Sequence, residues 1–319
     1  MENLITEYKQ RLEETFRAHE LYEALSDEER RMILNALTCP LKAIELFQYR
    51  RCTKECLEGL KQGSILFKAP MQFNDPFDSM IYWRKESVDP YFEDDRFKET
   101  LKKLCLWDAE CVALCLSCCF RISCFSEISN SPIMWAHYAD ACKGFCVGYE
   151  MHPAFDEVMD IGTGVDARKC VGAIFPVIYT DRRFDATTAM IREIEYAVAV
   201  EEGRLKELDL SHYDELEPYK TSLFKSKDWA YEREWRVLLR GFDGRDRRDW
   251  LLPSENITRV IYGPKMSALD MIEVGKALRE YTAWVQRPIK TQRMFANWQD
   301  DKYVFEIEDC GYVPVPGKW

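Results

Sequence analysis

The apolar positions of the N-terminal segment follow a helical period. They recur every three or four residues and so fall on one face of a predicted helix: Leu4, Ile5, Tyr8, Leu12 and Phe16. Ser26 and Glu29 form a capping-box pattern, which predicts a second helix that ends before Pro40. Residues 1–45 are therefore predicted to form an N-terminal helical hairpin, which packs on the main domain or binds a partner protein.

The main domain, residues 46–319, alternates short apolar runs typical of strands with amphipathic stretches typical of helices. Strands are predicted at 46–50, 64–70, 120–127, 143–150, 173–180, 233–240 and 259–263, with a closing strand pair near 286–308. Helices are predicted at 53–63, 89–119, 131–142, 185–207, 219–228 and 267–282. No strand is followed by a glycine-rich phosphate turn, so the pattern predicts an α+β fold with a mixed sheet of short strands and interspersed helices.

Composition and charge narrow the class of protein. The 319 residues are 47% hydrophobic and 31% charged, which excludes a disordered chain. The net charge of −11 argues against a broad electrostatic grip on nucleic acid or on anionic lipid. The opening MENLITEYKQRLEE lacks a basic start followed by an apolar run, and no apolar stretch approaches 18 residues. We therefore expect a cytoplasmic protein that does not interact with a membrane.

Thirteen cysteines are the unusual feature of the composition. In a reducing compartment, most of them are expected to fill the core as small hydrophobic residues. The CxxC pair at 115–118 lies in an apolar helical stretch, which argues against a zinc site, and no metal is predicted. A catalytic thiolate on Cys124 or Cys142 beside His137 is a lesser alternative.

Polar clusters interrupt the apolar strands at 49–51, 74–78, 123–127 together with 135–138, and 232–236. The clusters after the first lie in or beside motifs that follow one another along the chain: FNDPFD, CFSE, MWAHYAD, KGFCVGYE, WAYEREWR and IYGPKM. In this order they resemble the bacterial domain-of-unknown-function 2971 family over residues 46–266, which leaves 267–319 as a C-terminal α/β extension. Relatives commonly carry a histidine just before the KG dipeptide, where this chain has Cys142.

The order of an arginine on an early strand, Ser-x-x-Ser on a later strand and Glu-x-Glu on another is similar to that of ADP-ribosyltransferases. This resemblance implies that NAD is the substrate and that Arg50 or Arg51 clamps its pyrophosphate, a task that suits a guanidinium group. It also implies that Ser123 or Ser126 positions the nicotinamide ribose. Such an enzyme is expected to be a toxin or an antiphage effector, with a protein or nucleic-acid acceptor.

The remaining roles in this resemblance fall to carboxylates and aromatic residues. Glu234 would stabilise the oxocarbenium-like transition state, and Glu232 would help to activate the acceptor. On a strand, these two residues would face the same side of the sheet. Trp135 or Tyr138 would stack on the nicotinamide ring, and His137 would act as a general base or bind a ribose unless it is a packing residue.

The FNDPFD motif has a structural explanation and a functional one. Asn74 and Asp75 are expected to cap backbone amides while Phe73 and Phe77 plug the core. Alternatively, Asn74, Asp75 and Asp78 line the substrate pocket.

Two other functions compete with the transferase. In a non-catalytic binding module the motifs would only hold the fold, and residues 232–236 would form an exposed ion-pair ladder. A metal-dependent nuclease would use the following carboxylates, none of which has a diagnostic metal spacing: Asp75, Asp78, Glu127, Glu232 and Glu234.

Overall fold

The computed structural model describes most of the chain. The described residues are 2–18, 37–78, 81–118, 120–153, 157–161, 168–208, 217–240, 250–252, 254–297, 301 and 305–317. The second helix predicted from Ser26 and Glu29 lies outside them. None of the helices within these ranges combines the length and the apolar character that crossing a membrane requires.

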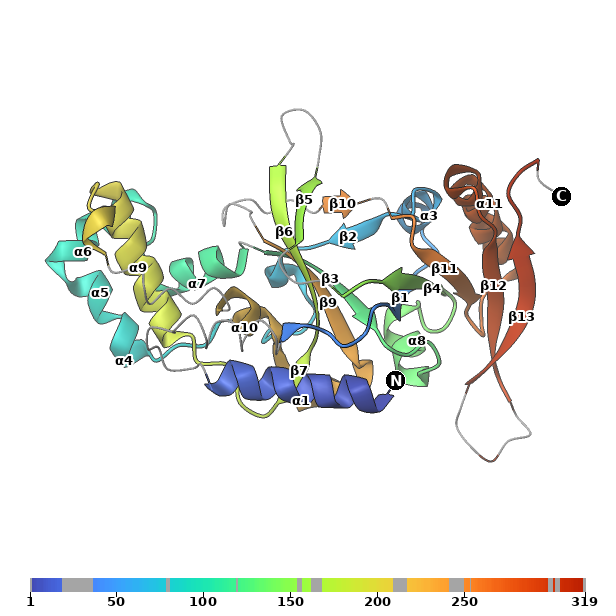
Figure 1. Ribbon diagram of the computed structural model, residues 1–319, viewed down its shortest axis with the longest axis horizontal. Helices are drawn as coiled ribbons and strands as arrows, with labels where there is room; N and C mark the ends of the chain where they lie inside the picture. Colours follow the sequence, from blue (N-terminus) through green and yellow to red (C-terminus); the bar gives the residue numbers. More distant parts are fainter. Residues whose placement is uncertain are drawn as a thin grey trace.

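A nine-stranded sheet forms the centre of the molecule (Figure 1). Its strands, in spatial order, are β13 (Phe305–Val313), β12 (Ile289–Ala296), β11 (Ile257–Tyr262), β4 (Phe145–Met151), β1 (Ile44–Arg50), β3 (Phe120–Ser126), β9 (Glu234–Arg240), β6 (Arg168–Pro176) and β5 (Glu157–Ile161). Neighbouring strands are antiparallel except for the parallel pair β11 and β12. Two small sheets pair β2 (Ile65–Phe67) with β10 (Trp250–Leu252) and β7 (Ile178–Thr180) with β8 (Phe224–Ser226). The mixed sheet of the predicted α+β fold is confirmed.

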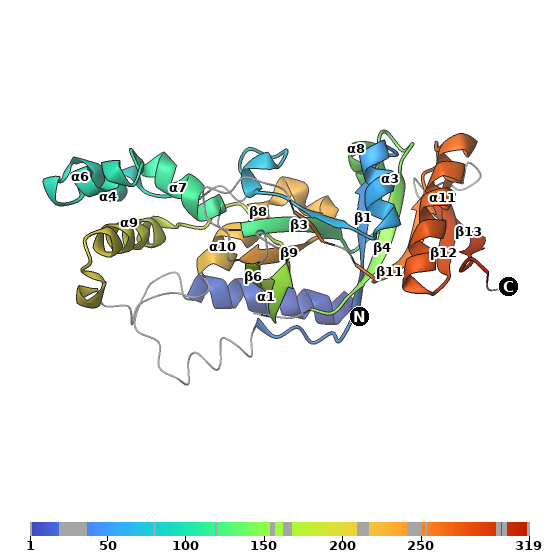
Figure 2. The same cartoon turned by 90° about the horizontal axis from the view of Figure 1, so that it is seen from above.

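The sheet opens between β1 and β3, which pair only at Phe47 and Ser126. By contrast, β1 pairs with β4, and β3 with β9, along their whole lengths. Figure 2 shows β1 and β4 turned steeply away from the direction of β3 and β9. The sheet thus has two halves, β13-β12-β11-β4-β1 and β3-β9-β6-β5, joined at one corner.

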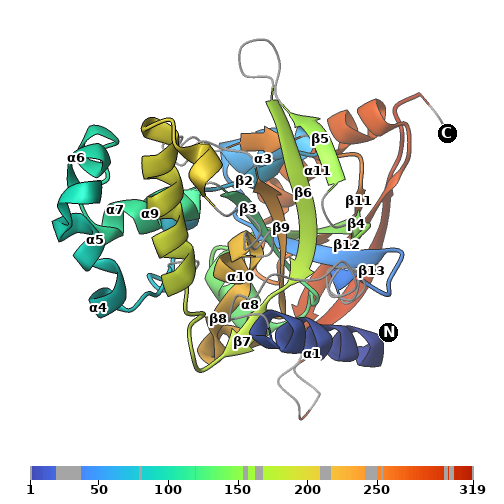
Figure 3. The ribbon, with the colours of Figure 1, turned by 60° about the vertical axis from the view of Figure 1, so that its left-hand side comes forward.

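Helices lie at the ends of this sheet and against its faces. Their bounds are α1 (Glu2–Ala18), α3 (Lys54–Lys61), α4 (Lys85–Val88), α5 (Pro90–Glu93), α6 (Asp95–Lys103), α7 (Ala109–Cys118), α8 (Pro132–Tyr138), α9 (Thr187–Glu201), α10 (Glu217–Leu223) and α11 (Ala268–Val285). Short 3-10 helices are η1 (Pro70–Gln72), η3 (Leu205–Glu207) and η5 (Lys227–Glu232). Figure 3 shows α4–α6 and α9 grouped away from the sheet at one end of the molecule, with α11 beside β12 and β13 at the other.

The N-terminal helix α1 packs on the half of the sheet that contains β9 and β6. Its predicted apolar face is buried at Ile5, Tyr8, Leu12 and Phe16, whereas Leu4 is 46% exposed. The ring of Phe16 contacts Phe175 and Phe224, and that of Tyr8 lies 6.3 Å from Trp235. The helical period therefore located this helix and, apart from Leu4, its buried face.

Two helices predicted as single elements are divided in the structure. The stretch 89–119 forms α5, α6 and α7, because Cys105 takes a left-handed conformation with a φ of 59° and ends α6. The predicted helix at 219–228 ends at Leu223, and the next three residues pair as β8 with β7. A tertiary strand pairing thus overrides the local helical pattern there.

The turn between α8 and β4 brings Gly144 against β1. A Cβ atom added at Gly144 would lie 2.1 Å from the carbonyl oxygen of Arg50. The turn is held from both sides, since the Gly144 amide donates to Ala139 and the Gly263 amide donates to the Gly144 carbonyl. Close packing of this kind leaves no room for a methyl group.

We expect Gly144→Ala to lower the free energy of unfolding by about 1–3 kcal/mol, because the backbone must shift to relieve the clash. Urea unfolding measures this change. The control is Gly275→Ala in α11, where an added Cβ atom meets nothing within 4 Å. This control should raise the free energy of unfolding by up to about 1 kcal/mol, since alanine favours a helix. Equal stability of the two variants would contradict the prediction.

Candidate functional site

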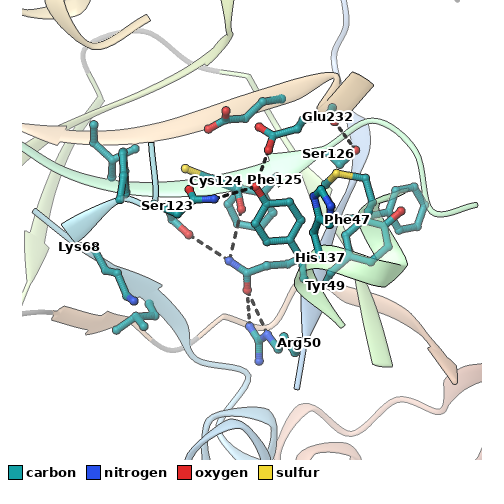
Figure 4. A pocket seen from close by; sticks show the side chains of 18 of the residues that line it. Phe47, Tyr49, Arg50, Lys68, Ser123, Cys124, Phe125, Ser126, His137 and Glu232 are labelled. Atoms are coloured by element: carbon teal, nitrogen blue, oxygen red, sulfur yellow. Dashed lines mark hydrogen bonds between the residues drawn. The ribbon is translucent and has the colours of Figure 1, made fainter. Parts of the chain in front are cut away.

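A cavity of about 790 Å³ opens where β1 and β3 separate. Its lining comes from β1, α3, β2, residues 72–78, β3, α8 and the segment that leads into β9. Figure 4 shows Arg50 and Lys68 on one side of the cavity and Ser126 and Glu232 on the opposite side. This volume is within the roughly 300–1,000 Å³ typical of sites for small molecules.

A buried lysine on one side of the cavity forms ion pairs with three carboxylates. The Lys225 Nζ atom lies 2.6 Å from Glu232 Oε2 and 2.8 Å from Glu234 Oε2. It also lies 3.3 Å from Asp78 Oδ2. Lys225 belongs to β8 and Asp78 to the FNDPFD motif, so segments far apart in the sequence meet at one ammonium group.

Arg236 is fully buried beside this lysine. Its Nη2 atom donates to both carboxylate oxygens of Asp78, at 2.6 and 2.7 Å, and its Nε atom donates to Glu234 Oε1 at 2.8 Å. We call Asp78, Lys225, Glu232, Glu234 and Arg236 the buried charge cluster. Its three carboxylates face two cations, so with every group ionised the cluster has an excess of one negative charge.

The two glutamates of this cluster differ in protonation. Burial disfavours the charged form of Glu234, but Arg236 and Lys225 outweigh it and hold the pKa of Glu234 well below its usual value. Burial raises the pKa of Glu232, and the attraction of Lys225 only partly offsets it. Burial would lower the pKa of Lys225, yet the carboxylates around it raise that pKa. Glu234 is therefore a fixed anion, while Glu232 can exchange a proton more readily.

Glu232 and Glu234 reach the cavity by a different route from the predicted one. Glu232 ends η5, Arg233 takes a left-handed conformation with φ 47° and ψ 52°, and Glu234 begins β9. The prediction that both lie on one strand was wrong, because the chain turns sharply at Arg233. The turn nevertheless aims both carboxylates at Lys225. The alternative of an exposed ion-pair ladder at 232–236 is also wrong, since Glu232, Glu234 and Arg236 are buried.

Aromatic and amide groups lie beside the buried Glu232, on its cavity side. The Tyr138 hydroxyl donates to Glu232 Oε1, and Asn74 Nδ2 lies 3.3 Å from that hydroxyl. The Tyr231 hydroxyl lies 3.3 Å from His137 Nδ1. Burial, and then the hydrogen bond to the Glu232 carboxylate, raises the pKa of Tyr138, which therefore remains protonated. These groups also line the cavity, except for Tyr231.

The opposite side of the cavity carries three cationic side chains. Arg50 is held in place: its Nη2 donates to Gln48 Oε1 at 2.7 Å and to the Ser64 carbonyl at 3.0 Å. Arg51 is exposed and Lys68 is half-buried, and both line the cavity. Within the described part of the chain, neither of these two is paired with a carboxylate. They are the cations most accessible to an anionic ligand.

The predicted serines take part in the protein's own hydrogen bonds. The Ser126 hydroxyl donates to the Glu232 carbonyl at 2.6 Å and accepts from the Ile128 amide at 3.2 Å. The Ser123 hydroxyl accepts from Gln48 Nε2 at 3.2 Å. Both serines line the cavity, and Ser126 supports the segment that carries the glutamates.

Other predicted site residues lie elsewhere. Trp135 is fully buried behind the cavity lining, where its Nε1 donates to the Ser129 carbonyl at 2.7 Å, so no face is left for stacking on a ligand. Asp75 is outside the lining and accepts from the Phe77 amide at 2.9 Å, as a capping side chain does. Phe77 was predicted in the core but is 66% exposed, because the Asx turn directs it outward.

Comparison with known proteins gives one match. Residues 134–237 match the model of a family described as protein of unknown function (DUF2971). The chain is similar to this family over that segment, which is about a third of its length. No curated protein and no solved structure matches the chain. The DUF2971 segment includes His137, Tyr138, Lys225 and the two glutamates, whereas Arg50 and the FNDPFD motif precede it.

Sequence reasoning missed the lysine at the centre of the site. Nothing in FKSKDW distinguishes Lys225 from an exposed lysine, apart from Trp229 four residues later, whose ring centroid lies 5.1 Å from the ammonium group. Gln48 and Lys68, which also line the cavity, were missed as well. Each is a polar residue in an otherwise apolar strand region, and this pattern was a sequence signal that could have identified them.

The geometry gives little support to thiolate chemistry at Cys124 or Cys142. Burial, and then the neighbouring Glu234 charge, raises the pKa of Cys124 well above its usual value, and burial also raises the pKa of Cys142. Neither thiol is thus activated. Among the residues that the structure describes, no group of three or more potential ligands could hold a metal ion.

Proposed function

We propose that this protein cleaves the bond between nicotinamide and ribose in NAD and transfers ADP-ribose to water or to a macromolecular acceptor. One observation carries the proposal. Strands β1, β3 and β9 are consecutive neighbours in the sheet, and they bring Arg50, Ser126 and Glu234 to one cavity. This is the order of residues by which the sequence resembles ADP-ribosyltransferases.

The charge distribution in the cavity suits a dinucleotide with a cationic end. Arg51 and Lys68 lie on the side where the diphosphate would bind. The excess negative charge of the buried charge cluster lies on the other side, where the nicotinamide ribose would become an oxocarbenium ion. An anion that is already in position stabilises such a developing cation, because no side chain has to move during the reaction. Glu234 is that anion, since its ion pairs with Arg236 and Lys225 fix its position.

In the proposed step the bond between ribose C1′ and the nicotinamide ring nitrogen breaks. The bonding electron pair goes to the ring nitrogen, so nicotinamide leaves as a neutral molecule and C1′ becomes cationic. An oxygen of water or of the acceptor then forms a bond with C1′, and its proton passes to the Glu232 carboxylate. The raised pKa of Glu232 makes it a better base than an ordinary glutamate.

Tyr138 and His137 are the side chains best placed beside the reacting ribose. The Tyr138 ring lines the cavity, and its hydroxyl orients Glu232 by hydrogen bonding. His137 is exposed at the same edge, where it can bind a ribose hydroxyl or a group of the acceptor.

The test is incubation of the purified protein with NAD while free nicotinamide is measured. Release together with free ADP-ribose indicates hydrolysis. Release that requires added protein or nucleic acid, with labelled ADP-ribose retained on that acceptor, indicates transfer. No release with water, lysate protein or nucleic acid would overturn the proposal and favour a binding module. Nucleic-acid cleavage that requires added Mg²⁺ would favour the nuclease, although three of the carboxylates it would use already contact Lys225 or Arg236, namely Asp78, Glu232 and Glu234.

We further propose that the protein acts as a toxin or antiphage effector by depleting NAD. Induced expression in a bacterial host should then lower cellular NAD before growth stops. Growth arrest with unchanged NAD would contradict this role while leaving transfer to a specific acceptor possible.

Lys68→Met should raise the KM for NAD roughly tenfold and leave kcat unchanged, because a charged hydrogen bond to phosphate contributes about 1.5–3 kcal/mol and acts equally in substrate and transition state. Steady-state nicotinamide release gives both constants. The matched control is Lys102→Met on α6, an exposed lysine paired with Glu99 outside the cavity. An equal KM for the two variants would remove Lys68 from the diphosphate site.

A further inference from the structure

A single carboxylate on the far side of the sheet holds the turn that carries the two glutamates. Glu127 directly follows β3, and only 6% of its side chain is exposed. Its Oε1 accepts from Trp235 Nε1 at 2.7 Å, and its Oε2 accepts from Arg233 Nε at 2.9 Å. Its backbone amide donates to the Arg233 carbonyl at 3.1 Å. Glu127 therefore contacts the residue between the glutamates and the residue after them.

This turn requires such support. Arg233 is in the left-handed region, with a φ of 47° and a ψ of 52°, a conformation that disfavours residues with a Cβ atom. An extended Arg233 would leave Glu232 and Glu234 on one face but would separate their Cα atoms by roughly 6–7 Å along the strand. The left-handed turn instead brings both carboxylates to their shared partner Lys225.

The N-terminal helix completes this contact. Lys9 of α1 forms an ion pair with Glu127, and the neighbouring Tyr8 packs against Trp235. A carboxylate with three donors from separate elements keeps a fixed orientation. Helix α1 is therefore connected to the site indirectly, through the ion pair between Lys9 and Glu127.

We infer that Glu127 is a positioning residue that fixes the Arg233 turn, and that Lys9 of α1 assists it. Glu127 does not line the cavity, so it acts only through the glutamates. The inference rests on the proposed function for its kinetic consequence, whereas its structural consequence is independent of that function.

The kinetic experiment uses Glu127→Ala in the full chain. We expect kcat for nicotinamide release to fall roughly 100-fold, since a displacement of about 1 Å at the reacting groups costs that much, while KM stays within about twofold. Adding Arg233→Gly should recover most of the lost kcat, because glycine adopts the left-handed conformation without the support of Glu127. The control is Glu45→Ala, which removes the ion pair with Arg259 outside the cavity and should leave kcat unchanged.

A second readout does not depend on NAD. The held turn should protect the bond after Arg233 from trypsin, and Glu127→Ala should expose it, so that mass spectrometry detects a new N-terminus at Glu234. Lys9→Met should give the same product in smaller amount. Where the alanine variant does not fold, Glu127→Gln replaces it and should give the same product.

The outcomes separate the two proposals. No nicotinamide release by the wild type overturns the proposed function, and the trypsin result then decides the inference alone. An active wild type with an unchanged kcat in Glu127→Ala overturns the inference and leaves the proposed function in place. Loss of kcat that Arg233→Gly does not recover also overturns it, because Glu127 would then act by another route.

Discussion

Replacing Glu232 by glutamine is expected to lower kcat for nicotinamide release with acceptor by about 10²–10⁴-fold, the usual contribution of a general base. Glutamine keeps the shape of the side chain and its contact with Tyr138, but it cannot take the proton of the attacking oxygen. Lys225 still pairs with Asp78 and Glu234, so the buried charge cluster remains assembled. The loss should therefore appear in kcat rather than in folding.

The dependence on pH supplies a second signature. Glu232 must be ionised to act as a base, and burial raises its pKa above the ordinary value of about 4.3. Wild-type activity should fall as the pH drops through this raised pKa, and the residual activity of Glu232→Gln should lack that acidic limb. The sign for stability is opposite. A raised pKa means that the protonated form favours the folded state, so the neutral variant should melt no lower than the wild type at pH 7.

The control for this variant is Glu207→Gln in η3, an exposed glutamate outside the cavity. It should match the wild type in kcat and in pH profile. If Glu232→Gln retains activity and keeps the acidic limb, another base acts in its place, and His137 would be the first to examine.

Much of the fold could be predicted because apolar spacing reports burial directly. The period of Ile5, Tyr8 and Phe16 located α1 and the face that packs on the sheet. The break at Cys105 had no such signal, because a left-handed residue without glycine depends on its tertiary surroundings. Likewise, Phe224 continues a helical pattern and becomes a strand only because β7 lies beside it.

The site could be predicted only as a set of motifs. Glu232, Glu234 and Asp78 stand out as polar residues in apolar stretches, so the sequence pointed to them. Lys225 did not stand out, since its importance arises from three carboxylates that converge on it in space. For the same reason Trp135, although it lies in a motif, proved to be a core residue. Motif membership alone does not distinguish a residue that lines the cavity from one that packs in the core behind it.

Replacing Arg236 by methionine is expected to lower the free energy of unfolding by about 3–5 kcal/mol at pH 7, because it leaves buried carboxylates without their main partner. Arg236 is fully buried and binds Asp78 through two hydrogen bonds and Glu234 through another. In the wild type the lowered pKa of Glu234 stabilises the fold above the ordinary glutamate pKa, and this contribution is lost as the pH falls. This loss begins only below the ordinary glutamate pKa of about 4.3, so the deficit of the variant should be smaller at about pH 3 than at pH 7.

Urea unfolding at both pH values measures this deficit, with Arg96→Met as the matched control. Arg96 is highly exposed and pairs with Asp94 on the surface, so its removal should change the free energy of unfolding by less than about 1 kcal/mol. Adding Asp78→Asn to Arg236→Met should recover part of the loss, since the second change removes one of the two stranded charges. A deficit that stays constant with pH, or that Asp78→Asn deepens, would mean that Arg236 stabilises the fold through packing against Phe73 rather than through charge.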